Sequence, residues 1–466
     1  MRAELTALQA ELKGSLVLPG SPGYEDARRP SDPRHRGLRP NAIAYCHSTD
    51  DISAAVRCGA RLGLRVTPRS GGHCFAGRSS VGDLVLDVSA MDRITLTDGP
   101  VEVEAGARLG RLYPTLAAHR LTLPAGCGPT VGIAGLTLGG GLGLLGRRYG
   151  LTCDRLSAAE VVLADGRVVF CDDRHHSDLF WALRGAGGGH FGIVTRFVFD
   201  PVPEPTVTVF RLAWPPDDAP SLVAAWMDWA PAADDRLTAQ LVLSAPEDPG
   251  QPPTIRLIGT MSAELRTTEP AAAEFGALAG AKAVDATFQA LRYAKAKAVL
   301  GEDPPEAERL LESHRSQLLA EPFSSTTVTQ LLDHLSQSRR PGQSRTLSFL
   351  PMAGAYSRVA VDATAFAHRR ARFLVEHVAA VRPTASPVEQ MAAAEWSAGS
   401  RRVLAAASSG GVYPNFPDPD LRDWADAYWG ANRVRLQQVK QRYDPDNVFW
   451  ARQGLHLDNE RSRADA

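Results

Sequence analysis

The sequence predicts an α+β fold made of two structural units, and three observations support this prediction. Short strand-like runs separated by turn residues fill residues 1–204. Beyond Pro201, Pro203 and Pro205, longer strands alternate apolar with polar residues and are separated by helices, which indicates an antiparallel sheet backed by helices through residues 205–405. Residues 406–466 include an aromatic-rich stretch that we expect to dock on the first unit.

The composition indicates a protein that binds a small molecule. The 466 residues, 44% of them hydrophobic, can form two sizeable cores. Lys plus Arg (51) balance Asp plus Glu (52), so no overall field favours nucleic acid or an anionic membrane. Residues 1–18 lack the apolar core of a secretory signal, and no apolar run approaches the roughly 18 residues of a membrane span, so we expect a soluble, cytoplasmic protein. The six cysteines form no Cys-x-x-Cys pair and are expected to be reduced.

The first unit should begin with a short helix and a Pro- and Arg-rich arm that ends near residue 40. Ser48 or Thr49 caps the next helix, and the strand after it leads directly into a loop at residues 69–77, at the end of a βαβ unit. Asp165-Gly166 is a hairpin signal, and Ser177 caps a later helix. The expected strands are 42–45, 65–67, 83–88, 94–96, 101–105, 159–164, 167–170 and 193–199, and the expected helices are 50–62, 177–183 and one that includes Leu109, Leu112 and Leu116.

The second unit should consist of longer strands and intervening helices. We expect residues 294–340 to be mostly helical and exposed to solvent. In the C-terminal segment, a helix is expected from Leu421 through Tyr443, and the charged residues after His456 are expected to fray. The expected strands are 207–214, 237–243, 254–259 and 346–350, and the expected helices are 219–229, 270–278 and 363–380.

Two stretches, residues 127–150 and 185–192, are so rich in glycine that the backbone must be their working surface. Gly141, Gly143 and Gly146 satisfy the Gly-x-Gly-x-x-Gly spacing of a dinucleotide-binding fold. However, that fold needs a buried strand before the motif and an unbroken helix after it, and both are missing here. The two loops more plausibly hold one long cofactor, with amide protons facing a pyrophosphate.

The loop at residues 69–77 places one imidazole, that of His73, among residues that allow close approach by a ligand. No residues with metal-ligand spacing surround His73, and no Gly-x-Ser-x-Gly motif occurs in the chain. A nucleophile toward a cofactor remains as its role.

Other polar groups near glycine loops have weaker claims to a function. Tyr149 and His190 could face a cofactor or simply cap a turn. Residues 172–176 contain two aspartates and two histidines, but their position before a helix favours ordinary turn chemistry, so no metal is predicted.

Four motifs together resemble the berberine-bridge-enzyme-like flavoprotein oxidases of the vanillyl-alcohol-oxidase superfamily. They are Arg-Ser-Gly-Gly-His at 69–73, the glycine stretch to residue 150, Leu-Arg-Gly-Ala-Gly-Gly-Gly at 183–189, and Tyr-x-Asn-Phe at 413–416. The resemblance implies a PCMH-type FAD-binding domain formed by residues 1–204 and the segment 406–466, with a substrate domain between them. It also implies that a ring nitrogen of His73 is bonded to the 8α carbon of FAD. The other cofactor-binding residues implied are Arg69, Ser70, Gly71, Gly72, Gly77, Gly128, Thr130, Val131, Gly132, Gly135, Gly139, Gly140, Gly141, Gly143, Gly192, Ile193, Val194 and Asn415.

The sequence departs from the family pattern at two positions. Many relatives have a second flavin link from a cysteine directly before Pro-x-Val-Gly, but Gly128 stands there and Cys127 comes one residue early. A shift of one residue turns a side chain to the other face of an extended segment, so we expect a single link through His73. The last tyrosine of Tyr-x-Asn-Tyr, which often accepts the substrate proton in relatives, is Phe416 here. Tyr413 is the nearest substitute as proton acceptor in the sequence, although packing against the flavin domain is slightly favoured as its role.

The resemblance implies an oxidase that transfers hydride from an alcohol or amine carbon to FAD and passes the electrons to O2, giving H2O2. An intermediate of secondary metabolism is the expected substrate. A carbohydrate oxidase is the first alternative, and a dehydrogenase with poor oxygen reactivity is another. A protein of this fold that only binds a small molecule is an alternative of a different class.

Overall fold

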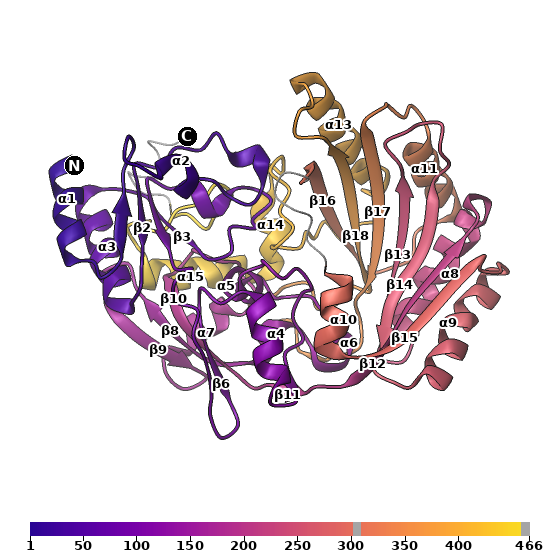
Figure 1. Ribbon diagram of the computed structural model, residues 1–466, viewed down its shortest axis with the longest axis horizontal. Helices are drawn as coiled ribbons and strands as arrows, with labels where there is room; N and C mark the ends of the chain where they lie inside the picture. Colours follow the sequence, from indigo (N-terminus) through magenta and orange to yellow (C-terminus); the bar gives the residue numbers. More distant parts are fainter. Residues whose placement is uncertain (302–308, 458–466) are drawn as a thin grey trace.

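The computed structural model describes residues 1–301 and 309–457, which form two units side by side (Figure 1). The N-terminal unit and the C-terminal segment lie together on one side, and the middle of the chain forms the other side. The tail for which we expected fraying lies, from residue 458 on, outside the described residues.

A small parallel arrangement in the first unit supports the loop that carries His73. The sheet has the order β1-β2-β4-β3, and β2 (Ala42–Tyr45) and β3 (Val66–Arg69) both run parallel to β4 (Leu84–Asp87). Helix α3 (Thr49–Leu62) connects β2 to β3, and its cap is Ser48, whose Oγ accepts a hydrogen bond from the Asp51 amide. The expected βαβ unit is therefore present, and β1 (Ser15–Val17) adds antiparallel to β2. The remaining helices of this region are α1 (Arg2–Glu11), α2 (Tyr24–Ala27), η1 (Pro33–His35) and η2 (Arg78–Ser80).

A second, five-stranded sheet of the first unit has the order β5-β6-β10-β8-β9. The hairpin predicted at residues 165–166 joins β8 (Leu156–Val162) to β9 (Val168–Asp172). Ser177 is the first residue of α7 (Ser177–Leu183) and not its cap, because the preceding His176 occupies the cap position with φ of 47°. The other elements are β5 (Ile94–Leu96), β6 (Val101–Glu104), α4 (Leu109–Ala117), β7 (Leu121–Thr122), α5 (Ile133–Leu138), α6 (Gly146–Tyr149), η3 (Thr152–Arg155), β10 (Ile193–Phe199) and β11 (Val202–Pro203).

The second unit is an antiparallel sheet of the order β15-β12-β14-β13-β17-β18-β16 with helices packed on one face (Figure 1). Its hydrophobic core lies between the sheet and these helices, which leaves the other sheet face toward the first unit. The strands are β12 (Thr206–Trp214), β13 (Leu237–Ala245), β14 (Thr254–Met261), β15 (Asp285–Arg292), β16 (Leu311–Leu319), β17 (Gln343–Pro351) and β18 (Phe373–Val381). The helices are η4 (Pro216–Asp218), α8 (Ala219–Ala232), α9 (Leu265–Ala279), α10 (Tyr293–Leu300), α11 (Ser325–Ser336), α12 (Ala355–Arg358) and α13 (Pro387–Val403).

Three expectations about helices were wrong. The helix expected at 363–380 is absent, and the second part of that segment forms strand β18. The region 294–340 contains strand β16 between α10 and α11. Each of these strands pairs with a neighbour along its full length, so tertiary pairing overrides the local helix preference of their alanine and leucine residues. The helix expected from Leu421 to Tyr443 is broken into α14 (Trp424–Trp429), η6 (Gly430–Asn432) and α15 (Arg433–Tyr443), because Gly430 has φ of 46°.

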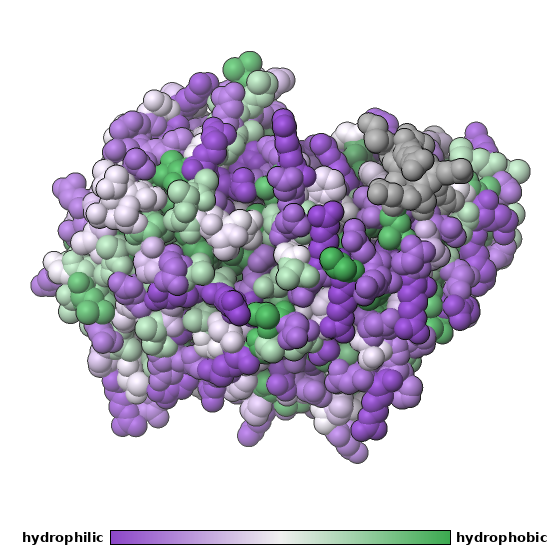
Figure 2. Space-filling model, turned by 180° about the vertical axis from the view of Figure 1, so that it is seen from behind, coloured by the Kyte–Doolittle hydropathy of each residue, from purple (hydrophilic) through white to green (hydrophobic). Residues whose placement is uncertain are grey.

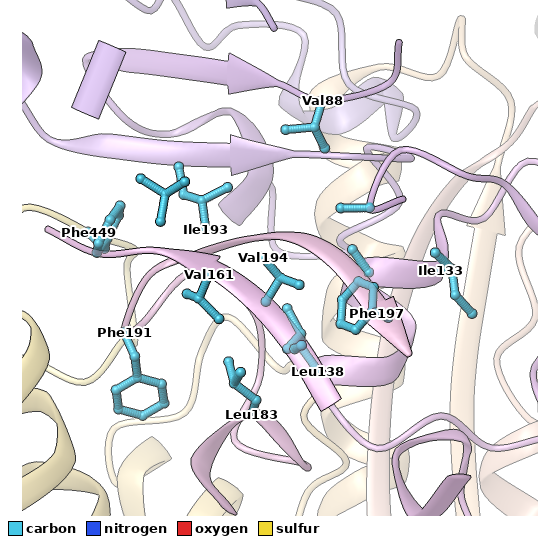
Figure 3. Packing of buried hydrophobic residues seen from close by; sticks show 14 of the residues in the cluster. Val88, Ile133, Leu138, Val161, Leu183, Phe191, Ile193, Val194, Phe197 and Phe449 are labelled. Carbon is cyan, nitrogen blue, oxygen red and sulfur yellow. The ribbon is translucent and has the colours of Figure 1, made fainter. Parts of the chain in front are cut away.

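The C-terminal segment shares the hydrophobic core of the first unit. Phe449 packs in the same cluster as Ile193 and Val194 (Figure 3). The Val66 amide donates to the carbonyl of Val448 at 2.8 Å, so the segment also extends the first sheet through its backbone. This shared core supports our proposal that residues 1–204 and 406–466 form one domain and that 205–405 form the second.

Arg147 joins the two units. Its side chain is fully buried in α6, and its guanidinium donates to the carbonyls of Leu237, Pro231, Met352 and Ala233 at 2.6–3.2 Å. All of these acceptors belong to the middle of the chain, so a glycine-rich loop of the first unit is held against the second sheet.

No helix in residues 1–301 or 309–457 has the length and apolar character needed to cross a bilayer. The molecular face seen in Figure 2 is mostly hydrophilic, with hydrophobic residues scattered across it.

Candidate functional site

A cavity of about 380 Å³ lies between the glycine loops of the first unit and the C-terminal segment. Its volume falls in the range typical of small-molecule and cofactor sites. The cavity brings together thirteen of the residues predicted from the sequence: Ser70, Gly71, Gly72, His73, Gly128, Val131, Gly132, Gly135, Gly192, Ile193, Val194, Tyr413 and Asn415. Gly187, Gly188 and Gly189 of the second glycine stretch also line it.

The other predicted residues do not line the cavity. Arg69 is buried, and its Nε donates to the carboxylate of Asp87 at 2.7 Å, so it fixes the end of β3. Gly77 packs against the ring of His35. Thr130 supports His73, as described below. Gly139, Gly140, Gly141 and Gly143 pack against Asn415, Phe366, Thr152 and Ala125, respectively.

Glycine is required where the two main loops meet. A Cβ atom on Gly71 would lie 2.3 Å from the amide nitrogen of Gly132, and a Cβ on Gly132 would lie 2.5 Å from that of Gly71. Real Cβ atoms do not approach other atoms so closely, so both residues must lack a side chain. The next residue, Gly72, has φ of 71°, a conformation that glycine adopts without steric cost.

His73 projects from the loop after β3 into the cavity. Its Nε2 is hydrogen-bonded to Thr130 Oγ1 at 2.8 Å, and this bond orients the ring toward the loop at residues 126–132. Cys127 and Gly128 of that loop line the cavity as well. The imidazole therefore has a fixed orientation beside a surface made mainly of backbone.

Tyr413 and Asn415 attach the C-terminal segment to the glycine stretch. The Tyr413 hydroxyl oxygen accepts hydrogen bonds from the amides of Gly141 at 3.0 Å and Leu142 at 3.2 Å, and from Asn415 Nδ2 at 3.0 Å. Burial raises the pKa of Tyr413 to about 12, although these donors partly oppose the shift. The phenol is thus protonated at neutral pH and its oxygen is fully engaged, which favours a structural role.

Two titratable side chains of the second sheet, which sequence reasoning missed, lie at the edge of the cavity. His314 in β16 and Glu376 in β18 face each other, with 3.6 Å between Nε2 and Oε1. The His314 ring stacks on Phe75 with 4.6 Å between ring centroids, and it meets the edge of Phe416 at 4.9 Å. Both phenylalanines line the cavity. No local signal could have revealed them, because neither strand alternates apolar with polar residues.

The weaker candidates lie away from the cavity. Tyr149 and His190 are not among its lining residues. His190 is buried, burial lowers the pKa of its imidazole, and its carbonyl accepts a hydrogen bond from Lys440. Asp172 accepts hydrogen bonds from the backbone and ring of His175, as in an ordinary turn. The described part of the chain contains no group of residues suited to a metal ion.

Comparison with known proteins identifies the family. Residues 40–172 match the family model described as "FAD binding domain", and residues 412–456 match "Berberine and berberine like". The chain is 32% identical over 454 residues to an uncharacterized FAD-linked oxidoreductase, YgaK, of Bacillus subtilis, covering 96% of this chain and 98% of the relative. The chain belongs to the berberine-bridge-enzyme-like FAD-linked oxidoreductases.

Two further family members extend the comparison. The solved structure of the Physcomitrella patens berberine-bridge-enzyme-like protein 1 superposes with a TM-score of 0.87 at 25% identity, covering 98% of this chain and 100% of that one. A chitooligosaccharide oxidase of Gibberella zeae is 29% identical over 428 residues, covering 88% of this chain and 86% of the relative.

The cavity residues fit FAD. Backbone amides from three glycine-rich loops offer donors for a diphosphate, and no Asp or Glu lines the cavity to repel it. The imidazole of His73 is a nucleophile of the type that can bond to a cofactor. The amide of Asn415 can donate to or accept from a polar ring edge.

Proposed function

We propose that the protein is an oxidase that removes hydride from an alcohol or amine carbon of a small secondary-metabolite-type substrate, with FAD bonded covalently through His73. Bound FAD supplies the hydride acceptor and returns the electrons to O2 as H2O2. The observation that carries this proposal is the fixed His73 ring in a cavity formed by three glycine loops.

The proposed link can be tested by acid precipitation of the holoenzyme. We expect flavin to remain with the protein pellet, and we expect His73→Ala to keep FAD bound but extractable. Cys127→Ala is the matched control and should leave the flavin in the pellet. Release of all flavin from the native protein would refute covalent attachment, and release from Cys127→Ala alone would reassign the link to the cysteine.

We infer that the His314–Glu376 pair accepts the proton that leaves the substrate oxygen or nitrogen. The pair lies beside Phe75 and Phe416, which line the cavity and provide apolar faces for a substrate. Tyr413, the earlier candidate, lacks a free lone pair to receive a proton.

Glu376→Gln tests this assignment because it keeps the shape of the side chain but removes its basicity. Loss of a positioned general base lowers turnover by about 10²- to 10⁴-fold. The control is Glu312→Gln, a neighbouring carboxylate in the same strand as His314. Equal turnover in the native enzyme and Glu376→Gln would eliminate the pair as proton acceptor.

A carbohydrate is the second candidate substrate, because the sheet face without helices carries several hydroxyl groups. Leu243 and Phe349 point into the core on the helix side, so Ser244, Thr346 and Ser348 lie on the opposite face. Hydroxyl groups of this kind suit a polyhydroxylated ligand. Peroxide release measured against matched sets of sugars, alcohols and amines distinguishes the two candidates, and release with none of them would count against an oxidase.

A further inference from the structure

Lys297 is a buried cation behind the wall of the flavin cavity. Lys297 lies in helix α10 and is only 2% exposed. Its Nζ lies 2.5 Å from the carbonyl oxygen of Ala125, 2.9 Å from that of Gly126 and 3.5 Å from Cys127 Sγ. Gly126 and Cys127 line the cavity, so a single loop separates the Nζ atom of Lys297 from the cavity.

The contacts of Lys297 match its protonated form. An ammonium has three N–H donors, and three acceptors surround Nζ. The rings of Tyr113 and Tyr293 also approach, each with its centroid 5.1 Å from Nζ, a distance at which a cation is attracted to an aromatic face. Burial lowers the pKa of Lys297, while the neighbouring Cys127 opposes that shift.

No carboxylate forms an ion pair with Lys297 within residues 1–301 and 309–457. The contrast is Lys440, which is equally buried and has Asp444 Oδ2 at 2.5 Å from its Nζ. A buried charge without a counter-charge destabilises a protein, and groups in such environments cluster at functional sites.

We propose that Lys297 supplies the positive charge that stabilises the reduced, more negative form of the flavin, and so raises its oxidising power. Hydride carries two electrons and one proton, so its transfer from a substrate carbon adds one negative charge to the flavin while the substrate proton leaves separately. Reoxidation by O2 removes two electrons and forms H2O2 with two protons. The charge on Lys297 is fixed throughout, and it therefore favours the reduced state.

This inference rests on the proposed placement of FAD beside His73, whose Thr130 partner belongs to the same loop as Cys127. At an effective dielectric constant of about 20, one unit charge several ångströms away changes an equilibrium by roughly tenfold or more. The quantity to compare between variants is therefore the equilibrium constant for reduction of the bound flavin, measured against a redox dye.

The test compares Lys297→Gln with the native holoenzyme. The glutamine amide can still donate two hydrogen bonds to Ala125 and Gly126, but it carries no charge. We expect the reduction equilibrium constant to fall by about tenfold, with a more negative midpoint potential. Lys297→Met removes the donors as well as the charge and is expected to show the same shift, so the test remains possible if one variant does not fold.

Tyr113→Phe is the matched control. The Tyr113 hydroxyl donates to the carbonyl of Gly126 at 2.7 Å, so its loss loosens the same loop without changing charge. We expect its potential to equal that of the native protein. An unchanged potential in Lys297→Gln, or an equal fall in Tyr113→Phe, would overturn the inference. Acid precipitation of each variant tests the His73 link separately, so failure of the proposed link is distinguishable from failure of the charge effect.

Discussion

Replacing Tyr413 with phenylalanine separates a structural role from a catalytic one. The substitution removes the oxygen that accepts from the Gly141 and Leu142 amides and from Asn415 Nδ2. A buried donor left without a partner costs about 1–3 kcal/mol. The Asn415 amide still donates to the carbonyl of Leu136, and the Leu142 amide is partly accessible to water. We therefore expect a loss of about 2–4 kcal/mol in the free energy of unfolding.

Thermal unfolding and anaerobic flavin reduction by a substrate together provide the assay. A fall in Tm of several degrees is expected with hydride transfer within about threefold of the native rate, because no proton passes through Tyr413. Tyr356→Phe is the matched control, since its hydroxyl bonds to the amide and carbonyl of Gly143 in the same glycine stretch. A loss of hydride transfer of about 100-fold or more without loss of stability would refute the structural role and restore Tyr413 as proton acceptor.

Three further predictions concern stability and flavin content. Arg369→Met leaves the Asp154 carboxylate, whose side chain is 9% exposed, without its guanidinium partner and should lower the free energy of unfolding by about 3–5 kcal/mol, with partial recovery when Asp154→Asn is added, as measured by denaturant titration. Burial lowers the pKa of His377 to about 3, so below about pH 6.5 the unfolded state binds more protons than the folded state. The free energy of unfolding should therefore fall by up to about 1.4 kcal/mol per pH unit as the pH decreases from about 6.5 toward 3. His377→Gln should flatten this dependence on pH. Gly71→Ala should separate the two cavity loops and reduce bound flavin, whereas Gly37→Ala, with open space around its Cβ position, should keep the native flavin-to-protein absorbance ratio.

Local features of the sequence predicted the site better than features that depend on strand order. The loop around His73 and the glycine stretches are contiguous, and their composition alone indicates a backbone surface for a cofactor. His314 and Glu376 are distant in the sequence and become neighbours only because β18 pairs with both β17 and β16. Since the segments that contain them were expected to be helical, their common face could not be predicted.

Similar reasons account for the elements of the fold. The strands of the first unit are short and bounded by turn residues, so their order along the chain was predictable. Strand β18 contains two alanines and a histidine among its apolar residues, and pairing with its two neighbours decides its conformation. The break at Gly430 depends on one positive φ within an otherwise helical pattern.

Because the first unit and the C-terminal segment share a core, we expect flavin attachment to come late in the synthesis of the chain. One wall of the cavity is formed by Tyr413, Asn415 and Trp450 of the C-terminal segment. His73, which also lines the cavity, comes more than three hundred residues earlier in the sequence. A ribosome-bound chain that ends before this segment lacks that wall and the strand-like contact at Val66. We therefore expect the proposed attachment of flavin to His73 to follow synthesis of the C-terminal segment, so that bound flavin reports that this segment has been made and has folded.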